Sequence, residues 1–179
     1  MAEEGTALKH DYDYVSGNGT LIAYNYTDIS KAGTKTVKCG ICGVNDDSIE
    51  ALPLIVYDGY SINGKGAVCV GYAINCDEID RYEALTGITL VYGFAAAANN
   101  DKPLDENGEA VNANVIKTVL SNDRYTAVDF ILTAKNWNDE ATANAKLSLN
   151  MYLIREGAVK YITENGLSDV AEQKTYSEI

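Results

Sequence analysis

Hydrophobic side chains recur at every second position through much of this 179-residue chain, and this period constrains the fold more than any other feature. In the clearest run, residues 147–153, leucines and a methionine alternate with Ser148, Asn150 and Tyr152. Successive side chains of a strand point to opposite faces, so the run predicts a strand with one buried face. Similar runs occupy residues 68–74, 88–94 and 125–134. No stretch shows a convincing 3.6-residue period, and an all-β fold is therefore predicted.

Turn residues and prolines divide these runs. Glu156-Gly157 separates two strand candidates at hairpin spacing, and Pro53 predicts an edge strand or two shorter pieces within residues 49–57. A short helix or turn is expected over residues 77–85, with Asn75 or Asp77 as its cap. Residues 112–120 show helical spacing but are rich in β-branched side chains, which favours a strand.

The turn-rich stretch 58–64 suggests a boundary between two parts of the chain. We expect a small cysteine-knuckle β-hairpin region over residues 1–57. An antiparallel, immunoglobulin-like β-sandwich would follow over residues 58–166, and residues 167–179 would form a polar tail or linker.

Charge limits the partners. With 14 Lys and Arg against 26 Asp and Glu, the formal net charge is -12, which argues against nucleic acid and anionic membrane surfaces. No apolar run approaches the ~20 residues that span a bilayer, so membrane insertion is not expected. The acidic opening Met1-Ala2-Glu3-Glu4 does not resemble a signal peptide, so an exported protein would begin as a longer precursor.

Cysteines provide the first candidate site. Cys39 and Cys42 have the spacing of half a zinc ribbon, with His10 as a conceivable third ligand. A disulfide between Cys39 and Cys42, or two thiols, is favoured over zinc. Cys69 lies inside a predicted strand, where a buried and inert thiol is expected. A four-cysteine site that includes Cys69 and Cys76, and a bridge between those two, stay open as alternatives.

Two loops provide further candidates. Asp105, Asn107 and Glu109 offer oxygen ligands at alternate positions, as a calcium loop would, but the EF-hand spacing is missing and a solvated hairpin loop is favoured. Trp137 is flanked by the amides of Asn136 and Asn138 and could stack on a sugar or a partner surface.

The favoured interpretation of Trp137 is instead a ring that folds back and closes one end of the core.

Catalytic motifs are missing from the sequence: His10 is the single histidine, and neither a nucleophile elbow nor a phosphate-binding glycine loop occurs. An enzyme is therefore not expected, although a pair of carboxylates could meet only in three dimensions.

The segment that begins at His10-Asp11-Tyr12 and includes residues 32–43 and 49–53 resembles a cysteine-knuckle module of large surface and secreted proteins of Gram-positive gut anaerobes. In that module cysteines stand where this chain has Leu8 and Ile29, which puts a zinc site in doubt. Residues 66–162 are similar to the β-sandwich domains that follow such modules. The resemblance implies an extracellular location and no activity.

Together these patterns predict a non-catalytic extracellular module, structural or binding, within a larger bacterial cell-surface protein. Its expected partners are carbohydrate or a host or cell-surface protein, as in adhesion. A carbohydrate-binding module, and an accessory domain of a secreted glycan hydrolase, are the alternatives. No cofactor is expected beyond the zinc and calcium already considered.

Overall fold

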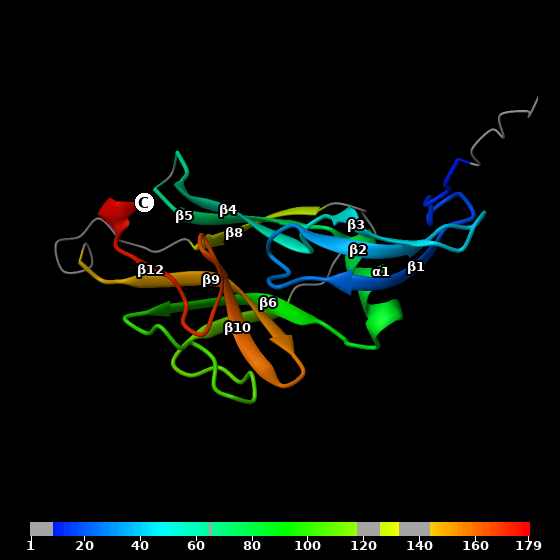
Figure 1. The fold of residues 1–179 in the computed structure, drawn as a ribbon. Coiled ribbons are helices and arrows are strands. Elements are labelled where there is room, and N and C mark those ends of the chain that lie inside the picture. Colours follow the sequence, from blue (N-terminus) through cyan, green and yellow to red (C-terminus); the bar gives the residue numbers. More distant parts are fainter. Residues whose placement is uncertain (1–8, 65, 118–125, 133–143) are drawn as a thin grey trace, which may run out of the picture.

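Antiparallel strands make up most of the computed structural model, which describes residues 9–64, 66–117, 126–132 and 144–179 (Figure 1). The predicted all-β class is thus confirmed, while an immunoglobulin-like arrangement stays a prediction. The helical elements are α1 (Cys76–Thr86) and the 3₁₀ turn η1 (Tyr176–Glu178). The strands are β1 (Thr20–Asn25), β2 (Gly33–Lys38), β3 (Asn45–Ala51), β4 (Ile55–Ile62), β5 (Val68–Ile74), β6 (Val91–Ala98), β7 (Asn114–Lys117), β8 (Thr126–Leu132), β9 (Leu147–Arg155), β10 (Ala158–Thr163), β11 (Gly166–Ser168) and β12 (Gln173–Lys174).

The first sheet is the meander β1-β2-β3 at the N-terminal end of the molecule. It ends at Ala51, and β4 begins at Ile55, so the segment around Pro53 forms two shorter strands as predicted. A proline lacks the N–H that a continuous ladder would need, which explains the break. This meander packs against α1, where Tyr24 and Tyr26 lie 5.6 and 6.1 Å from the ring of Tyr82.

The other two sheets face each other and enclose the main core. One has the order β4-β5-β8, and the other has the order β11-β10-β9-β6-β7, with β12 paired to β9. The expected division at residue 57 falls inside β4, which pairs with β5 from Ile55 to Ile62. Residues 167–179 supply most of β11 together with β12, both of which belong to the second sheet, and η1, which lies at one end of the molecule near the β4–β5 hairpin (Figure 1). The core contains fully buried residues from both sheets, among them Ile55, Val68, Val70, Ile74, Leu149, Met151, Leu153 and Ile162.

Two tyrosines of the first facing sheet hydrogen-bond to the backbone of the second. The Tyr60 hydroxyl donates to the carbonyl of Leu149 (2.6 Å) and accepts from its amide (3.1 Å). The Tyr72 hydroxyl donates to the carbonyl of Ile162 (2.8 Å) and accepts from the amide of Met151 (3.0 Å). Each hydroxyl therefore satisfies two backbone groups that water cannot reach, and it links the sheets at their centre.

Strand β9 is buried on both faces, so the prediction of one exposed face over residues 147–153 is wrong. Ser148 and Asn150 are fully buried. The Ser148 hydroxyl donates to the carbonyl of Asn100 (2.8 Å), because the loop after β6 covers this face. A second apolar cluster, which contains Leu104 and Tyr161, lies on the same side. The alternation is real, but a small polar residue with a partner can be buried as completely as a leucine.

Helix α1 forms where a short helix or turn was predicted. The side chain of Asn75 accepts from the amide of Glu78 (3.3 Å) and so caps the helix, while Gly87, at φ 72°, ends it in the left-handed conformation. Strand β7 occupies residues 114–117, in agreement with the favoured strand there. The hairpin at Glu156-Gly157 is also confirmed, with both residues at positive φ.

Candidate metal-binding knuckle and other polar sites

The Cys-x-x-Cys-Gly sequence forms a tight knuckle between β2 and β3. Cys39 follows directly after β2, and its amide donates to the carbonyl of Val44 (2.8 Å). The amide of Gly43 donates a hydrogen bond to the carbonyl of Cys39 (2.9 Å), and Gly43 itself lies at φ 75°. This left-handed conformation favours glycine, which explains the residue after the second cysteine.

Residues 9–19, which we call the arm, dock on this knuckle. The amide of Asp11 donates to Sγ of Cys39 (3.3 Å), and the amide of Gly40 donates to the carbonyl of Asp11 (3.0 Å). A Cβ at residue 40 would stand 2.2 Å from the carbonyl oxygen of Asn18, so only glycine allows so close an approach. The arm is thus held by backbone contacts that position His10.

His10, Cys39 and Cys42 form one cluster. The ligand atoms of the three side chains all lie within 4.8 Å of one another, and Nδ1 of His10 is 3.1 Å from Sγ of Cys42. Cys39 is buried, whereas His10 and Cys42 are exposed. Both cysteines are thiols in this structure. The structure therefore joins the two cysteines that the spacing singled out with the histidine that was considered as a third ligand.

The environment of Cys39 favours a thiolate. Burial raises the pKa of this thiol, but hydrogen bonds from the amides of Cys42 and Asp11, from the His10 ring and from the Ile41 amide lower the pKa to about 6. Thiolates are the form of cysteine that binds metals and reacts as a nucleophile.

The other cysteines lie elsewhere. Within the described residues, the cluster includes neither Cys69 nor Cys76, so a four-cysteine site is not assembled. Cys69 is buried in β5, as predicted. Ile29, which occupies a cysteine position of the resembling module, is buried in the main core. It lies beyond the far end of β1 and β2, roughly 16 Å along the strands from the knuckle.

The loop considered for calcium uses its central carboxylate internally. Oδ1 of Asp105 accepts from the amides of Asn107 and Glu109, both at 2.9 Å, and these bonds lower the pKa of Asp105. Leu104 and Ala110 pair across the loop. This arrangement is a closed hairpin loop, as favoured from the sequence. Trp137, Asn136 and Asn138 lie outside the described residues, so their role stays a prediction.

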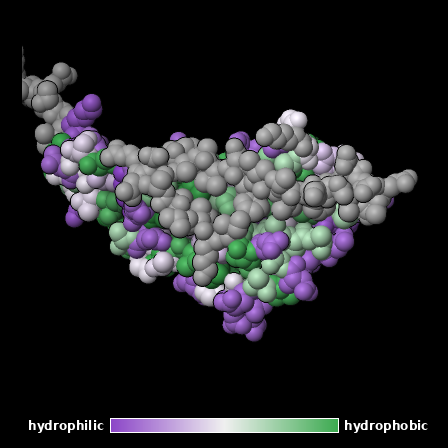
Figure 2. Space-filling model, turned by 180° about the vertical axis from the view of Figure 1, so that it is seen from behind, coloured by the Kyte–Doolittle hydropathy of each residue, from purple (hydrophilic) through white to green (hydrophobic). Residues whose placement is uncertain are grey.

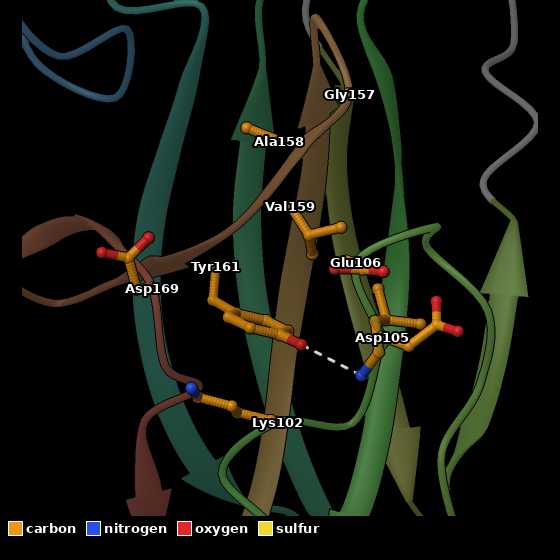
Figure 3. A pocket seen from close by; sticks show the side chains of 9 residues that line it. Lys102, Asp105, Glu106, Gly157, Ala158, Val159, Tyr161 and Asp169 are labelled. Atoms are coloured by element: carbon orange, nitrogen blue, oxygen red, sulfur yellow. Dashed lines mark hydrogen bonds between the residues drawn. The ribbon is translucent and has the colours of Figure 1, made fainter.

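A hollow of about 480 Å³ lies between that loop and β10 (Figure 3). Tyr161 faces it, but its hydroxyl accepts from the amide of Leu104 (3.0 Å) and the residue is 1% exposed. At the rim, the carboxylate of Asp169 pairs with Lys160. The aromatic ring of this hollow is therefore too buried to offer a sugar a stacking surface.

A buried ion pair, missed by the sequence analysis, lies between the N-terminal meander and α1. Nζ of Lys35 is 2.9 Å from Oε1 of Glu78, and the two side chains are 6% and 5% exposed. Lys35 also donates to the hydroxyl of Tyr14 (2.6 Å), while Glu78 accepts from the hydroxyl of Tyr24 (2.6 Å) and from Arg81 (3.4 Å). Burial lowers the pKa of Lys35, but its bonds to Tyr14 and Glu78 outweigh this and raise the pKa above 10.5.

Comparison of the chain with known protein families, with curated proteins and with solved structures finds no match in any of the three.

Helix α1 has 11 residues, and the described part of the chain contains no helix with the length and apolar character needed to cross a membrane. Figure 2 shows hydrophilic residues distributed around the outline of one face, with hydrophobic residues between them.

Proposed function

We propose that this chain is a non-catalytic structural module of a larger, extracellular cell-surface protein, which spaces or presents a binding surface. The observation that carries this proposal is the joint between the N-terminal meander and the rest of the molecule. Buried Lys35 and Glu78 connect β2 to α1, and the ring of Tyr82 packs on Tyr24 and Tyr26 of the meander. A buried, hydrogen-bonded charge pair favours one geometry over others, because any displacement leaves a charge without its partner.

The shape of the molecule agrees with a spacer. The two ends of the described chain lie at opposite ends of an elongated body, with the knuckle at one end and η1 at the other (Figure 1). The hydroxyls of Tyr60 and Tyr72 link the facing sheets through hydrogen bonds to backbone carbonyls. The resemblance of residues 10–53 to modules of exported proteins supports the extracellular location.

The location is tested with antibodies raised against the purified chain. On intact cells of the source organism, we expect surface labelling that external protease removes, while a cytosolic marker stays protected. An immunoblot should show a polypeptide larger than 19.3 kDa. Detection only after cell lysis would refute the proposed location.

A carbohydrate-binding role depends on Trp137, Asn136 and Asn138, and it remains the alternative proposal. It predicts binding on a glycan array that a Trp137→Ala variant loses. A Trp137→Phe variant, which retains an aromatic ring, should keep part of the signal. Binding by none of the three proteins would exclude this role, and equal binding by all three would exclude Trp137 as its site.

A further inference from the structure

We propose that His10, Cys39 and Cys42 bind one Zn²⁺ ion, with three protein ligands and a fourth position open to exchangeable ligands. This inference is independent of the proposed function. It starts from the cluster of three donor atoms. The arm and the knuckle bring these atoms together, although His10 and Cys42 are 32 residues apart in the sequence.

The distances fit a tetrahedral ion after a small adjustment. Zn–S and Zn–N bonds of about 2.3 and 2.0 Å imply S···S and S···N separations of about 3.8 and 3.5 Å in a tetrahedron. The three donor atoms already lie within 4.8 Å of one another, and the 3.1 Å between His10 and Cys42 needs to open by only a few tenths of an ångström. Both of these side chains are exposed, so they can move and the ion can enter.

The knuckle is organised around the sulfur of Cys39. Three backbone amides donate to it: those of Asp11 (3.3 Å), Ile41 (3.4 Å) and Cys42 (3.5 Å). Such bonds around a ligand fix its orientation and offset the negative charge of a metal-bound thiolate. An inert buried thiol has no need of three donors, so this arrangement points to a charged sulfur.

The donor set selects the ion. Two sulfurs and one imidazole nitrogen match the ligands that zinc uses, whereas calcium and magnesium require oxygen. The described residues contribute three ligands and no fourth His, Cys, Asp or Glu to the cluster. As far as the described residues go, the remaining position is left to solvent or an added ligand.

The metal would also have a mechanical effect. His10 belongs to the arm, and both cysteines belong to the turn between β2 and β3, so one ion would crosslink two segments that otherwise meet through hydrogen bonds. Binding should therefore protect the amides of residues 9–19 from hydrogen exchange, because the ion stabilises the docked state by mass action.

The test is a cobalt(II) titration of the full, reduced chain, followed by zinc competition. We expect one equivalent of Co²⁺, visible d–d bands typical of tetrahedral coordination and a sulfur-to-metal charge-transfer band. His10→Ala and Cys42→Ser should each weaken affinity more than the 10- to 100-fold that loss of an outer-shell partner costs. Cys76→Ser, which changes a thiol outside the cluster, should leave affinity unchanged. Added imidazole should shift the d–d bands, because it enters the open position.

X-ray absorption of the zinc-loaded wild type gives a readout that does not depend on variant folding. It should show two sulfur scatterers and two lighter nitrogen or oxygen scatterers. Absence of stoichiometric binding, retention of affinity in the His10→Ala variant, a spectrum that imidazole does not change, or more than two sulfur scatterers would each overturn the proposal.

Discussion

Replacement of Lys35 by methionine tests the buried joint between the meander and α1. Removing one partner of a buried ion pair leaves the other charge uncompensated, at a cost of about 3–5 kcal/mol. For Lys35→Met the lower end is expected, about 3 kcal/mol, because Glu78 keeps the hydroxyl of Tyr24 at 2.6 Å and Arg81 at 3.4 Å. For Glu78→Met the upper end is expected, about 5 kcal/mol, because Lys35 keeps only the Tyr14 hydroxyl as a hydrogen-bond partner among the described residues.

The double variant Lys35→Met/Glu78→Met removes both charges and should return to within about 1 kcal/mol of the wild type. Free energies of unfolding are measured by urea titration followed by circular dichroism. The control is Lys160→Met, which removes an exposed pair with side chains 37% and 80% exposed and should cost less than about 1 kcal/mol. Two results would refute a buried pair in which each charge depends on its partner. One is a loss of unfolding free energy in the single variants no larger than in the control. The other is a loss in the double variant equal to the sum of the losses in the two single variants.

Three further predictions concern the core and the arm. Tyr72→Phe should cost about 2–4 kcal/mol in urea unfolding, because it leaves two buried backbone groups unsatisfied. Tyr57→Phe should change the free energy of unfolding very little, since the buried Tyr57 hydroxyl has no hydrogen-bond partner among the described residues. Equal losses of stability in the two variants would refute the role of the Tyr72 hydroxyl as a link between the sheets. Burial raises the pKa values of Tyr60 and Tyr72 above 10.0, so these hydroxyls lose their protons at lower pH in the unfolded chain than in the folded one. Stability should therefore fall as pH rises above about 10. The midpoint of urea unfolding, measured at several pH values, tests this. Gly40→Ala should displace the arm, because its Cβ would lie 2.2 Å from Asn18; faster hydrogen exchange in residues 9–19 checks this, and unchanged exchange would contradict it.

The sequence predicted strands best where alternation was long. Residues 147–153 lie within β9, and the break at Pro53 falls between two strands. The period could not show that a loop covers the second face of β9, because coverage depends on tertiary packing. Ser148 and Asn150 therefore looked exposed, although both are fully buried. Local pattern determines which residues share a face, but it does not determine what lies against that face.

The candidate site shows the same division. The spacing of Cys39 and Cys42 identified a knuckle, but only the folded arm brings His10 to Cys42. The Lys35–Glu78 pair gave no signal in the sequence, because a lysine in a strand and a glutamate in a helix are ordinary surface residues until the two elements pack. Lys35 and Glu78 are 43 positions apart, so their pairing depends on the fold and cannot be predicted from composition.

The buried joint should hold the meander and the two facing sheets as one rigid body, and pulsed electron paramagnetic resonance can measure a distance across that joint. Genetically encoded spin labels can replace Val44, beside the knuckle of the meander, and Val170, between β11 and β12 of the second facing sheet, without altering the native cysteines, because these valines are 54% and 40% exposed. A single narrow distance distribution is expected. A broad or two-peaked distribution would contradict the account, because it would show that the meander moves relative to the sandwich.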